Sequence, residues 1–410
     1  MPVDEVRSAG RGFDHGRLAL IDHHLKTRYV DPGKISGCQV LIARDGRVIH
    51  RADIGMKSFE GSELIDRDTM FRVYSMTKPL TSVAVMQLVE SARLQLSDPV
   101  ERFLPSWKNQ RVMETGGGLV PAARPMTVGH LLSHTSGLTY GSLLSYSGAD
   151  DSWDPTADFY RRAGVTREPG QTLEGFVEQL AGIPLAFHPG QRWSYSIATE
   201  VLARIVEIVS GDRFDEYLRR HVLRPLGMNS TDFWLGDADP SALAANYRRG
   251  ADRRPVRVAQ GEEADLRRPP TFLSGAGGLI STADDYLRFC EMLRGGGALD
   301  GRRILAPTTV RFMSRNHLPQ GRDIAASTAD PKFTTWAGVG FGLGFAMTID
   351  GTAAGSPVDG DFYWDGAAST LFWVDPVNRL SVVFMTQLMP QGTFAFRNQL
   401  KSLVYGALEV

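Results

Sequence analysis

Residues 71–94 read FRVYSMTKPLTSVAVMQLVESARL and join a short β-type run to a long apolar pattern. The apolar residues between Met76 and Val89 recur at helical spacing, which predicts a helix over residues 75–94 that is buried on most sides. Pro79 falls near the start of this helix, where a missing N–H does least harm. The pattern therefore places Ser75 where an extended segment turns into a buried helix.

Ser75 and Lys78 form an S-x-x-K motif, and a spacing of three puts both side chains on one helix face. Amides at a helix N-terminus favour a developing negative charge. A lysine on an apolar helix is costly without a partner, and desolvation lowers its pKa, so a neutral amine becomes available to accept a proton. A serine nucleophile needs such a base where no histidine serves. The alternative is a capping serine beside a lysine that reaches solvent.

Strand patterns gather near both ends of the chain, and helical patterns fill the middle. Two β-rich runs flank Asp45-Gly46 in residues 37–55, which predicts a hairpin. Further strand runs lie between residues 339 and 387. Helices are predicted over residues 12–30, 126–138, 195–211, 214–228, 282–296 and 393–408.

This order predicts an α+β fold, an antiparallel sheet built from the two termini, flanked by terminal helices and carrying an inserted, mostly helical lobe. We assign residues 1–74 and 275–410 to the sheet lobe and residues 75–274 to the helical lobe, with the active site in the cleft between them. Residues 139–170 and 240–272 show no period and are predicted to be long irregular connections.

Composition excludes several classes of protein. The chain has 410 residues, 45 Lys+Arg against 46 Asp+Glu, and a net charge of −1, so we expect no nucleic-acid partner. The two cysteines cannot form a disulfide framework. The N-terminal MPVDEVRSAGRGFDHG has acidic residues and no apolar run, and no stretch of about 18 apolar residues occurs. We therefore expect a cytoplasmic protein with no membrane partner, while its oligomeric state stays open.

Residues 71–105 resemble the nucleophile region of the serine β-lactamase and penicillin-binding-protein superfamily. HLLSHTSGL, residues 130–138, and GAGGLISTADDYLRF, residues 275–289, resemble its class C-like branch. The resemblance extends from about residue 35 to residue 408. It implies a β-lactamase/transpeptidase-like fold and two further motifs.

The second motif should centre on a tyrosine, and Tyr195 in WSYSI, residues 193–197, stands at the matching place. The resemblance implies that Tyr195, coupled to Lys78, takes the proton from Ser75 and later gives it to the leaving group. Class C β-lactamases have asparagine two residues on, whereas this chain has Ile197. The related family VIII esterases often lack that asparagine. Taken alone, Tyr195 could equally be a packing aromatic at a helix start.

The third motif is K-T-G in β-lactamases, and the matching run here is Trp364-Asp365-Gly366, followed by Ala367. Family VIII esterases carry W-x-G at this place. The resemblance implies that the N–H groups of Ala367 and Ser75 form an oxyanion hole and that Trp364, Asp365, Gly366 and Ile197 line the substrate site. Replacing lysine by Trp364 removes the cation that would hold a penicillin carboxylate and supplies apolar surface for a neutral ester.

Other residue patterns in the sequence do not indicate a second catalytic, metal-binding or phosphate-binding site. No G-x-S-x-G occurs, so the α/β-hydrolase nucleophile elbow is absent. His130 and His134 are four apart without H-E-x-x-H, and we expect structural roles for both. Gly340, Gly342 and Gly344 of GVGFGLGF, residues 338–345, lie in a strand-like run with no helix after it, which disfavours a phosphate-binding loop.

These motifs predict a serine esterase of the family VIII type that acts on small to medium carboxylic esters through an acyl-enzyme on Ser75. No metal or organic cofactor is implied. An acyltransferase with the same three residues is one alternative, and a β-lactamase or peptidoglycan peptidase with weak β-lactam hydrolysis is another. A non-catalytic binding module of the same fold is the alternative from a different class.

Overall fold

The computed structural model describes residues 12–114, 116–141, 143, 152–166, 170–259 and 265–409. The first eleven residues of the N-terminal segment considered above lie outside this range. Among the described residues, no helix is long and apolar enough to cross a membrane.

A seven-stranded antiparallel sheet forms the centre of the fold, in the order β11-β12-β13-β14-β15-β1-β2. Both ends of the chain supply strands, and they meet where Gln39 of β1 pairs with Met385 of β15. At the tip of the predicted hairpin, Asp45 (φ 53°) and Gly46 (φ 80°) adopt the left-handed backbone that a two-residue turn needs. The strands are β1 (Gly37–Arg44), β2 (Arg47–Gly55), β11 (Val339–Phe341), β12 (Ala346–Thr348), β13 (Phe362–Asp365), β14 (Leu371–Asp375) and β15 (Leu380–Met385).

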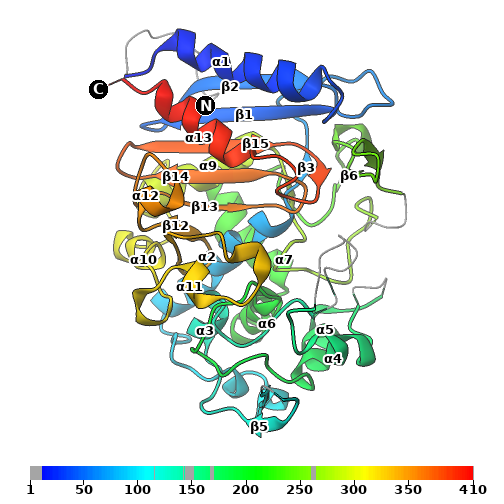
Figure 1. Cartoon of the computed structure of the whole chain (residues 1–410), viewed down its shortest axis with the longest axis vertical. Coiled ribbons are helices and arrows are strands. Elements are labelled where there is room, and N and C mark those ends of the chain that lie inside the picture. Colours follow the sequence, from blue (N-terminus) through cyan, green and yellow to red (C-terminus); the bar gives the residue numbers. More distant parts are fainter. Residues whose placement is uncertain are drawn as a thin grey trace.

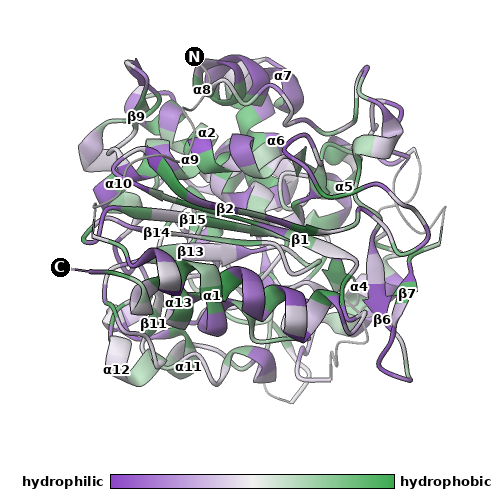
Figure 2. Ribbon diagram, turned by 90° about the horizontal axis from the view of Figure 1, so that it is seen from above, coloured by the Kyte–Doolittle hydropathy of each residue, from purple (hydrophilic) through white to green (hydrophobic). Residues whose placement is uncertain are grey.

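Helices cover both faces of this sheet. The terminal helices α1 (His15–Leu25) and α13 (Phe396–Gly406) lie together on one face, and α9 (Ala283–Arg294) lies on the other, as Figure 2 shows. Both terminal helices bury apolar residues at helical spacing: Leu18, Ile21 and Leu25 in α1, and Leu400 and Val404 in α13. The predicted α+β architecture, with a sheet made from both termini and covered by terminal helices, is confirmed.

A mostly helical region lies beyond α9, below the sheet in Figure 1. Its centre is the packing of α2 (Thr77–Glu90) against α6 (Ala198–Ser210). The chain leaves the sheet region through β3 (Phe71–Arg72) and returns through β8 (Ile280–Ser281), and these two strands pair. The other helices here are α3 (Val128–Leu132), α4 (Ala157–Arg162), α5 (Leu173–Ala181), α7 (Phe214–Leu218) and α8 (Arg224–Leu226).

The two connections predicted to be irregular contain short regular elements, so that prediction was wrong in part. Residues 139–170 include α4. Residues 240–272 include β6 (Tyr247–Arg249) and β7 (Pro255–Arg257), and β6 pairs in parallel with β16 (Leu388–Met389). Each strand of the β6–β7 hairpin has only three residues, most of them polar. Because backbone pairing with a distant strand stabilises the hairpin, its sequence does not show the alternation of apolar and polar residues that predicts a strand.

The remaining α-helices and strands are short. They are β4 (Arg111–Met113), β5 (Leu119–Pro121), β9 (Ala298–Leu299), β10 (Arg302–Arg303), α10 (Pro307–Met313), α11 (Ile324–Ser327) and α12 (Gly351–Ala354).

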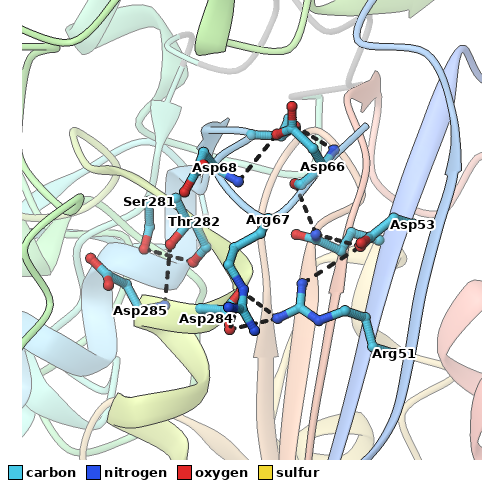
Figure 3. Close-up of polar contacts among 11 residues, drawn as sticks. Arg51, Asp53, Asp66, Arg67, Asp68, Ser281, Thr282, Asp284 and Asp285 are labelled. Atoms are coloured by element: carbon cyan, nitrogen blue, oxygen red, sulfur yellow. Dashed lines mark hydrogen bonds and ion pairs between the residues drawn. The ribbon is translucent and has the colours of Figure 1, made fainter. Parts of the chain in front are cut away.

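A polar network fastens the segment that leads to Ser75. Arg51 on β2 reaches between Asp53 on its own strand and Asp284 in the first turn of α9, as Figure 3 shows. Arg67, in the turn before β3, also faces Asp284. At the start of α9, the Thr282 side chain accepts a hydrogen bond from the Asp285 N–H and caps the helix. The network therefore ties the approach to β3 to both the sheet and α9.

Candidate active site

Ser75 lies in a single 3₁₀ turn, Tyr74–Met76, that runs directly into α2. The predicted helix start at Ser75 is thus two residues early. Tyr74 has φ 43°, an uncommon conformation for an aromatic residue, and its hydroxyl accepts a hydrogen bond from Asn246 Nδ2 at 2.8 Å. On the other side, the Tyr286 hydroxyl donates to the carbonyl of Met76 at 2.8 Å. The turn is therefore held from both ends, and Ser75 is half-buried.

Lys78 is almost fully buried, with 1% of its surface exposed, and its amine faces the serine. Lys78 Nζ donates to Ser75 Oγ at 3.1 Å and to the carbonyl oxygen of Ala276 at 2.8 Å. The same amine lies 4.8 Å from the centre of the Tyr195 ring and 5.6 Å from that of Tyr140. The structural alternative of a lysine reaching solvent is therefore wrong.

Tyr195 lies in the loop before α6, and neighbouring loops fix its position. The N–H of Trp193 donates to the Ser327 carbonyl, and the N–H of Ser194 donates to the His134 carbonyl. Burial alone would raise the pKa of the Tyr195 phenol, but the charge and hydrogen bonding of Lys78, with smaller contributions from Ser75 and Trp364, hold it below its usual value of 10.0. This environment favours a phenolate that can accept a proton.

The three predicted catalytic residues therefore lie in one cluster. Ser75 and Lys78 share one turn of the same segment, and Tyr195 comes from a loop 117 positions beyond Lys78. The spacing of Ser75 and Lys78 predicts that these two side chains lie together, whereas it is the fold that brings Tyr195 next to them.

The third motif lies beside the nucleophile turn because Gly366 has no side chain. A Cβ at Gly366 would lie 2.1 Å from Thr370 Oγ1 and 2.5 Å from the carbonyl oxygen of Val73, two residues before Ser75. Pairing between β12 and β13 ends at Tyr363, which leaves the following residues beyond the reach of β12. Ala367 is half-buried, and its N–H donates to no acceptor within the part of the chain that the structure describes.

Trp364 joins an aromatic wall around the site. Its ring centre lies 5.2 Å from that of Tyr195 and 6.0 Å from that of Trp336, which is half-buried. Phe333 lies 5.8 Å from Tyr195 and 5.1 Å from Trp336, and Tyr140 lies 5.1 Å from Tyr195. Apolar and aromatic surface of this kind suits an uncharged acyl or alcohol group.

Two residues that the sequence assigned to the substrate site have other partners. Asp365 forms an ion pair with Arg397 on α13 and accepts a hydrogen bond from Gln391. Ile197 is fully buried at the start of α6. We therefore assign neither side chain a contact with substrate, since one is turned to α13 and the other is packed in the core.

The sequence analysis missed a loop and a carboxylate behind Lys78. The Ala276 carbonyl accepts from Lys78, while the N–H of Ala276 donates to Glu200 Oε2 at 3.2 Å. Glu200 lies on α6 with none of its surface exposed. A signal existed, because a glutamate on the apolar face of a helix is costly without partners.

The histidines have structural partners. The His130 side chain accepts from the Thr127 N–H and completes a capping box at the start of α3. His134 is buried, and its Nδ1 lies 2.9 Å from Ser196 Oγ. His24 contacts Gln399 of α13. Across the described residues, no group of three or more His, Cys, Asp or Glu side chains could hold a metal ion.

Comparisons with known proteins agree with the geometry. The family model described as Beta-lactamase matches residues 22–405. Esterase EstB of Burkholderia gladioli is 31% identical over 396 residues, which cover 91% of this chain and 90% of EstB. Protein Rv1367c of Mycobacterium tuberculosis is 34% identical over 369 residues, which cover 88% of each chain.

Solved structures share the fold. The structure of EstCE1, described as a hydrolase with promiscuous acyltransferase activity, has a TM-score of 0.78 at 28% identity and covers 95% of this chain and 99% of its own. A simvastatin synthase (LovD) mutant from Aspergillus terreus has a TM-score of 0.76 at 20% identity, with 98% and 99% covered, and supports the fold alone. The chain therefore belongs to the Beta-lactamase family, in its esterase-like branch, and is a serine hydrolase of that fold.

Proposed function

We propose that the protein is a family VIII-type carboxylesterase that cleaves small to medium uncharged esters through an acyl-enzyme on Ser75. The observation that carries this proposal is the position of the Lys78 amine, 3.1 Å from Ser75 Oγ and 4.8 Å from the Tyr195 ring centre. A buried cation between a serine and a tyrosine favours the phenolate and keeps it beside the hydroxyl that must lose its proton.

Acylation begins when Ser75 Oγ attacks the ester carbonyl carbon and gives its proton to the Tyr195 phenolate. The N–H groups of Ser75 and Ala367 stabilise the oxyanion that forms. As the intermediate collapses, the C–O bond to the alcohol breaks, and the alcohol takes the proton from Tyr195. The acyl group is then esterified to Ser75, and Tyr195 is again a phenolate.

Deacylation repeats these steps with water. Tyr195 takes a proton from water as the water oxygen attacks the acyl carbon, and it returns that proton to Ser75 Oγ as the acid leaves. Lys78 stays protonated throughout and holds both oxygens in place. Its role is electrostatic: burial by itself would favour the neutral amine, whereas the hydrogen bonds to Ser75 and to the Ala276 carbonyl, together with the phenolate, favour the ammonium.

Mixing the enzyme with p-nitrophenyl esters of increasing chain length tests the proposal. We expect a burst of p-nitrophenol equal to the enzyme concentration, followed by slower turnover, and no burst from Ser75→Ala. A Ser75→Ala variant that keeps the burst would overturn the assignment. The control variant is Ser91→Ala, at the C-terminal end of α2, where the serine is exposed; it should behave as wild type.

Acyl transfer to an alcohol is the second candidate. The relatives that favour it include the acyltransferase calJ of Penicillium decumbens, 26% identical over 347 residues. The aromatic wall formed by Trp336, Trp364 and Phe333 could hold an alcohol acceptor as readily as the leaving alcohol. Measuring the ratio of transfer product to free acid with added alcohol separates the two reactions.

A further inference from the structure

The loop from Ser274 to Leu279 lies against α2 and α6 and is fixed by side chains from both helices. Thr81 of α2 donates to the carbonyl of Gly275 at 2.7 Å, and the N–H of Leu279 donates to Thr77 Oγ1 at 3.2 Å. A Cβ on Gly275 would lie 2.5 Å from the Ala203 side chain, so the loop can sit this close to α6 only with glycine there. The loop is therefore a fixed part of the site.

Glu200 holds this loop from the side of α6. Its Oε1 accepts from Ser274 Oγ at 2.6 Å, and its Oε2 accepts from the N–H of Ala276 at 3.2 Å. None of the Glu200 surface is exposed. The peptide between Gly275 and Ala276 is thus fixed by Thr81 at its carbonyl and by Glu200 at its N–H.

The Ala276 carbonyl is in turn the partner of the catalytic lysine, with Lys78 Nζ donating to it at 2.8 Å. One residue, Ala276, therefore connects a buried carboxylate to a buried amine. Glu200 lies five positions after Tyr195, at the start of the helix that follows that loop. The residue that fixes Ala276 thus lies on the helix that directly follows the loop of the proposed acid–base tyrosine.

The charged and titratable groups that face Lys78 come from several elements. They are Tyr195 from the loop before α6, Tyr140 and His134 from the segment after α3, and Glu200 from α6 through Ala276. Burial, followed by the charge of Lys78, holds the pKa of His134 well below its usual range, so this ring stays neutral. The Glu200 carboxylate supplies negative charge behind the lysine.

We propose that Glu200 is a positioning residue of the nucleophile site, whose buried carboxylate fixes Ala276 so that its carbonyl meets the Lys78 ammonium and whose charge keeps Lys78 protonated. This inference rests on the function proposed above, in which Lys78 acts as a cation. Glu200 does not touch the substrate. It acts through Ala276 and Lys78 on the Tyr195 phenolate.

The experiment measures the protonation of Lys78 directly, by ¹³C NMR titration of protein labelled at lysine Cε. The chain has seven lysines, so the Lys78 signal can be assigned with the Lys78→Met variant. In Glu200→Gln, which keeps the shape but not the charge, we expect the pKa of Lys78 to fall by about half a unit or more. Glu200→Asp keeps the charge and should leave the pKa within about 0.3 units of wild type.

Glu207→Gln is the matched control. Glu207 lies on the same helix and accepts from the N–H of Phe214 at 3.1 Å, away from the loop. Its substitution should leave the Lys78 pKa unchanged. An unchanged Lys78 pKa in Glu200→Gln, or an equal fall in Glu207→Gln, overturns the proposal.

Ser274→Ala provides a second test if Glu200→Gln does not fold. This variant keeps the carboxylate and removes one of its hydrogen bonds, so kcat should fall about threefold to tenfold while the Lys78 pKa stays as in wild type. A wild-type kcat would overturn the positioning role. The NMR titration needs no substrate, so a protein that cleaves no ester would refute the proposed function while the titration still decides the role of Glu200.

Discussion

Replacing Lys78 with methionine removes the cation that favours the Tyr195 phenolate while keeping a side chain of similar length. Lys78 Nζ lies 4.8 Å from the Tyr195 ring centre. At an effective dielectric constant of about 20, two unit charges at this distance interact by about 3 kcal/mol, which corresponds to two to three pKa units. Burial already raises the pKa of this phenol, so without Lys78 it should rise above its usual value of 10.0.

The pH profile of kcat/KM for one p-nitrophenyl ester measures this change. In the proposed mechanism the active form carries a deprotonated Tyr195, so activity should fall as the pH drops below the pKa of that phenol. Lys78→Met should move this acidic limb to higher pH by about two units or more and lower kcat/KM at pH 7 by several hundredfold.

Lys57→Met is the control, because Lys57 is a largely buried lysine whose charged partner is Asp66, at 3.1 Å. It should keep the wild-type profile. An unmoved acidic limb in Lys78→Met, or activity within tenfold of wild type, would refute the electrostatic role given to this lysine.

Three other predictions concern the strand, the substrate and stability. Gly366→Ala should lower kcat at least tenfold in a folded protein, because the new Cβ would lie 2.5 Å from the Val73 carbonyl oxygen. The control Gly182→Ala, whose Cβ would have no neighbour nearer than 3.9 Å, should have wild-type kinetics, and equal kinetics in the two variants would refute the prediction. Nitrocefin should be cleaved at least about a hundredfold more slowly than the best ester, since Trp364 replaces the cation for a lactam carboxylate; comparable rates would count against it. Burial raises the pKa of Asp285 from 3.8 to about 6, so the native state loses stability as pH rises between about 4 and 6. In urea unfolding, Asp285→Asn should be more stable than wild type by at most about 3 kcal/mol at pH 8, and this difference should vanish near pH 4. A difference in stability that does not depend on pH would contradict the prediction.

The sheet could be predicted because its strands carry their own signals. Asp45-Gly46 marks a tight turn between two β-rich runs, and the later strands alternate with turn residues, so local chemistry and global fold agree there. The β6–β7 hairpin could not be found in this way. Its pairing with β16 joins residues about 140 positions apart, and nothing local records that contact.

The proposed catalytic residues could be named from motifs, but the residues around them could not. Ser75 and Lys78 follow from spacing, whereas the start of α2 at Thr77 depends on the left-handed Tyr74, whose hydroxyl is held by Asn246 from a remote segment. The sequence does not show that Glu200 contacts Ala276, because the two residues are 76 positions apart and only the fold brings them together.

Only one of the two side chains in the W-x-G motif reaches the site, and strand geometry is the reason. Trp364 and Asp365 are adjacent on a strand, so they point to opposite faces of the sheet. Trp364 contacts Tyr195 in the site, whereas Asp365 pairs with Arg397 on the terminal helix. The motif identifies the strand, and strand geometry decides which side chain reaches the site.

The most direct test of the central claim, that Lys78 and Tyr195 act on Ser75 as one unit, is kcat on one ester for Lys78→Met, Tyr195→Phe and the double variant. Each single substitution should lower kcat by about 10³-fold, and the double variant should be little worse than either, because residues that act together lose their function together. Losses that multiply in the double variant, or a near-normal kcat in Tyr195→Phe, would contradict the claim.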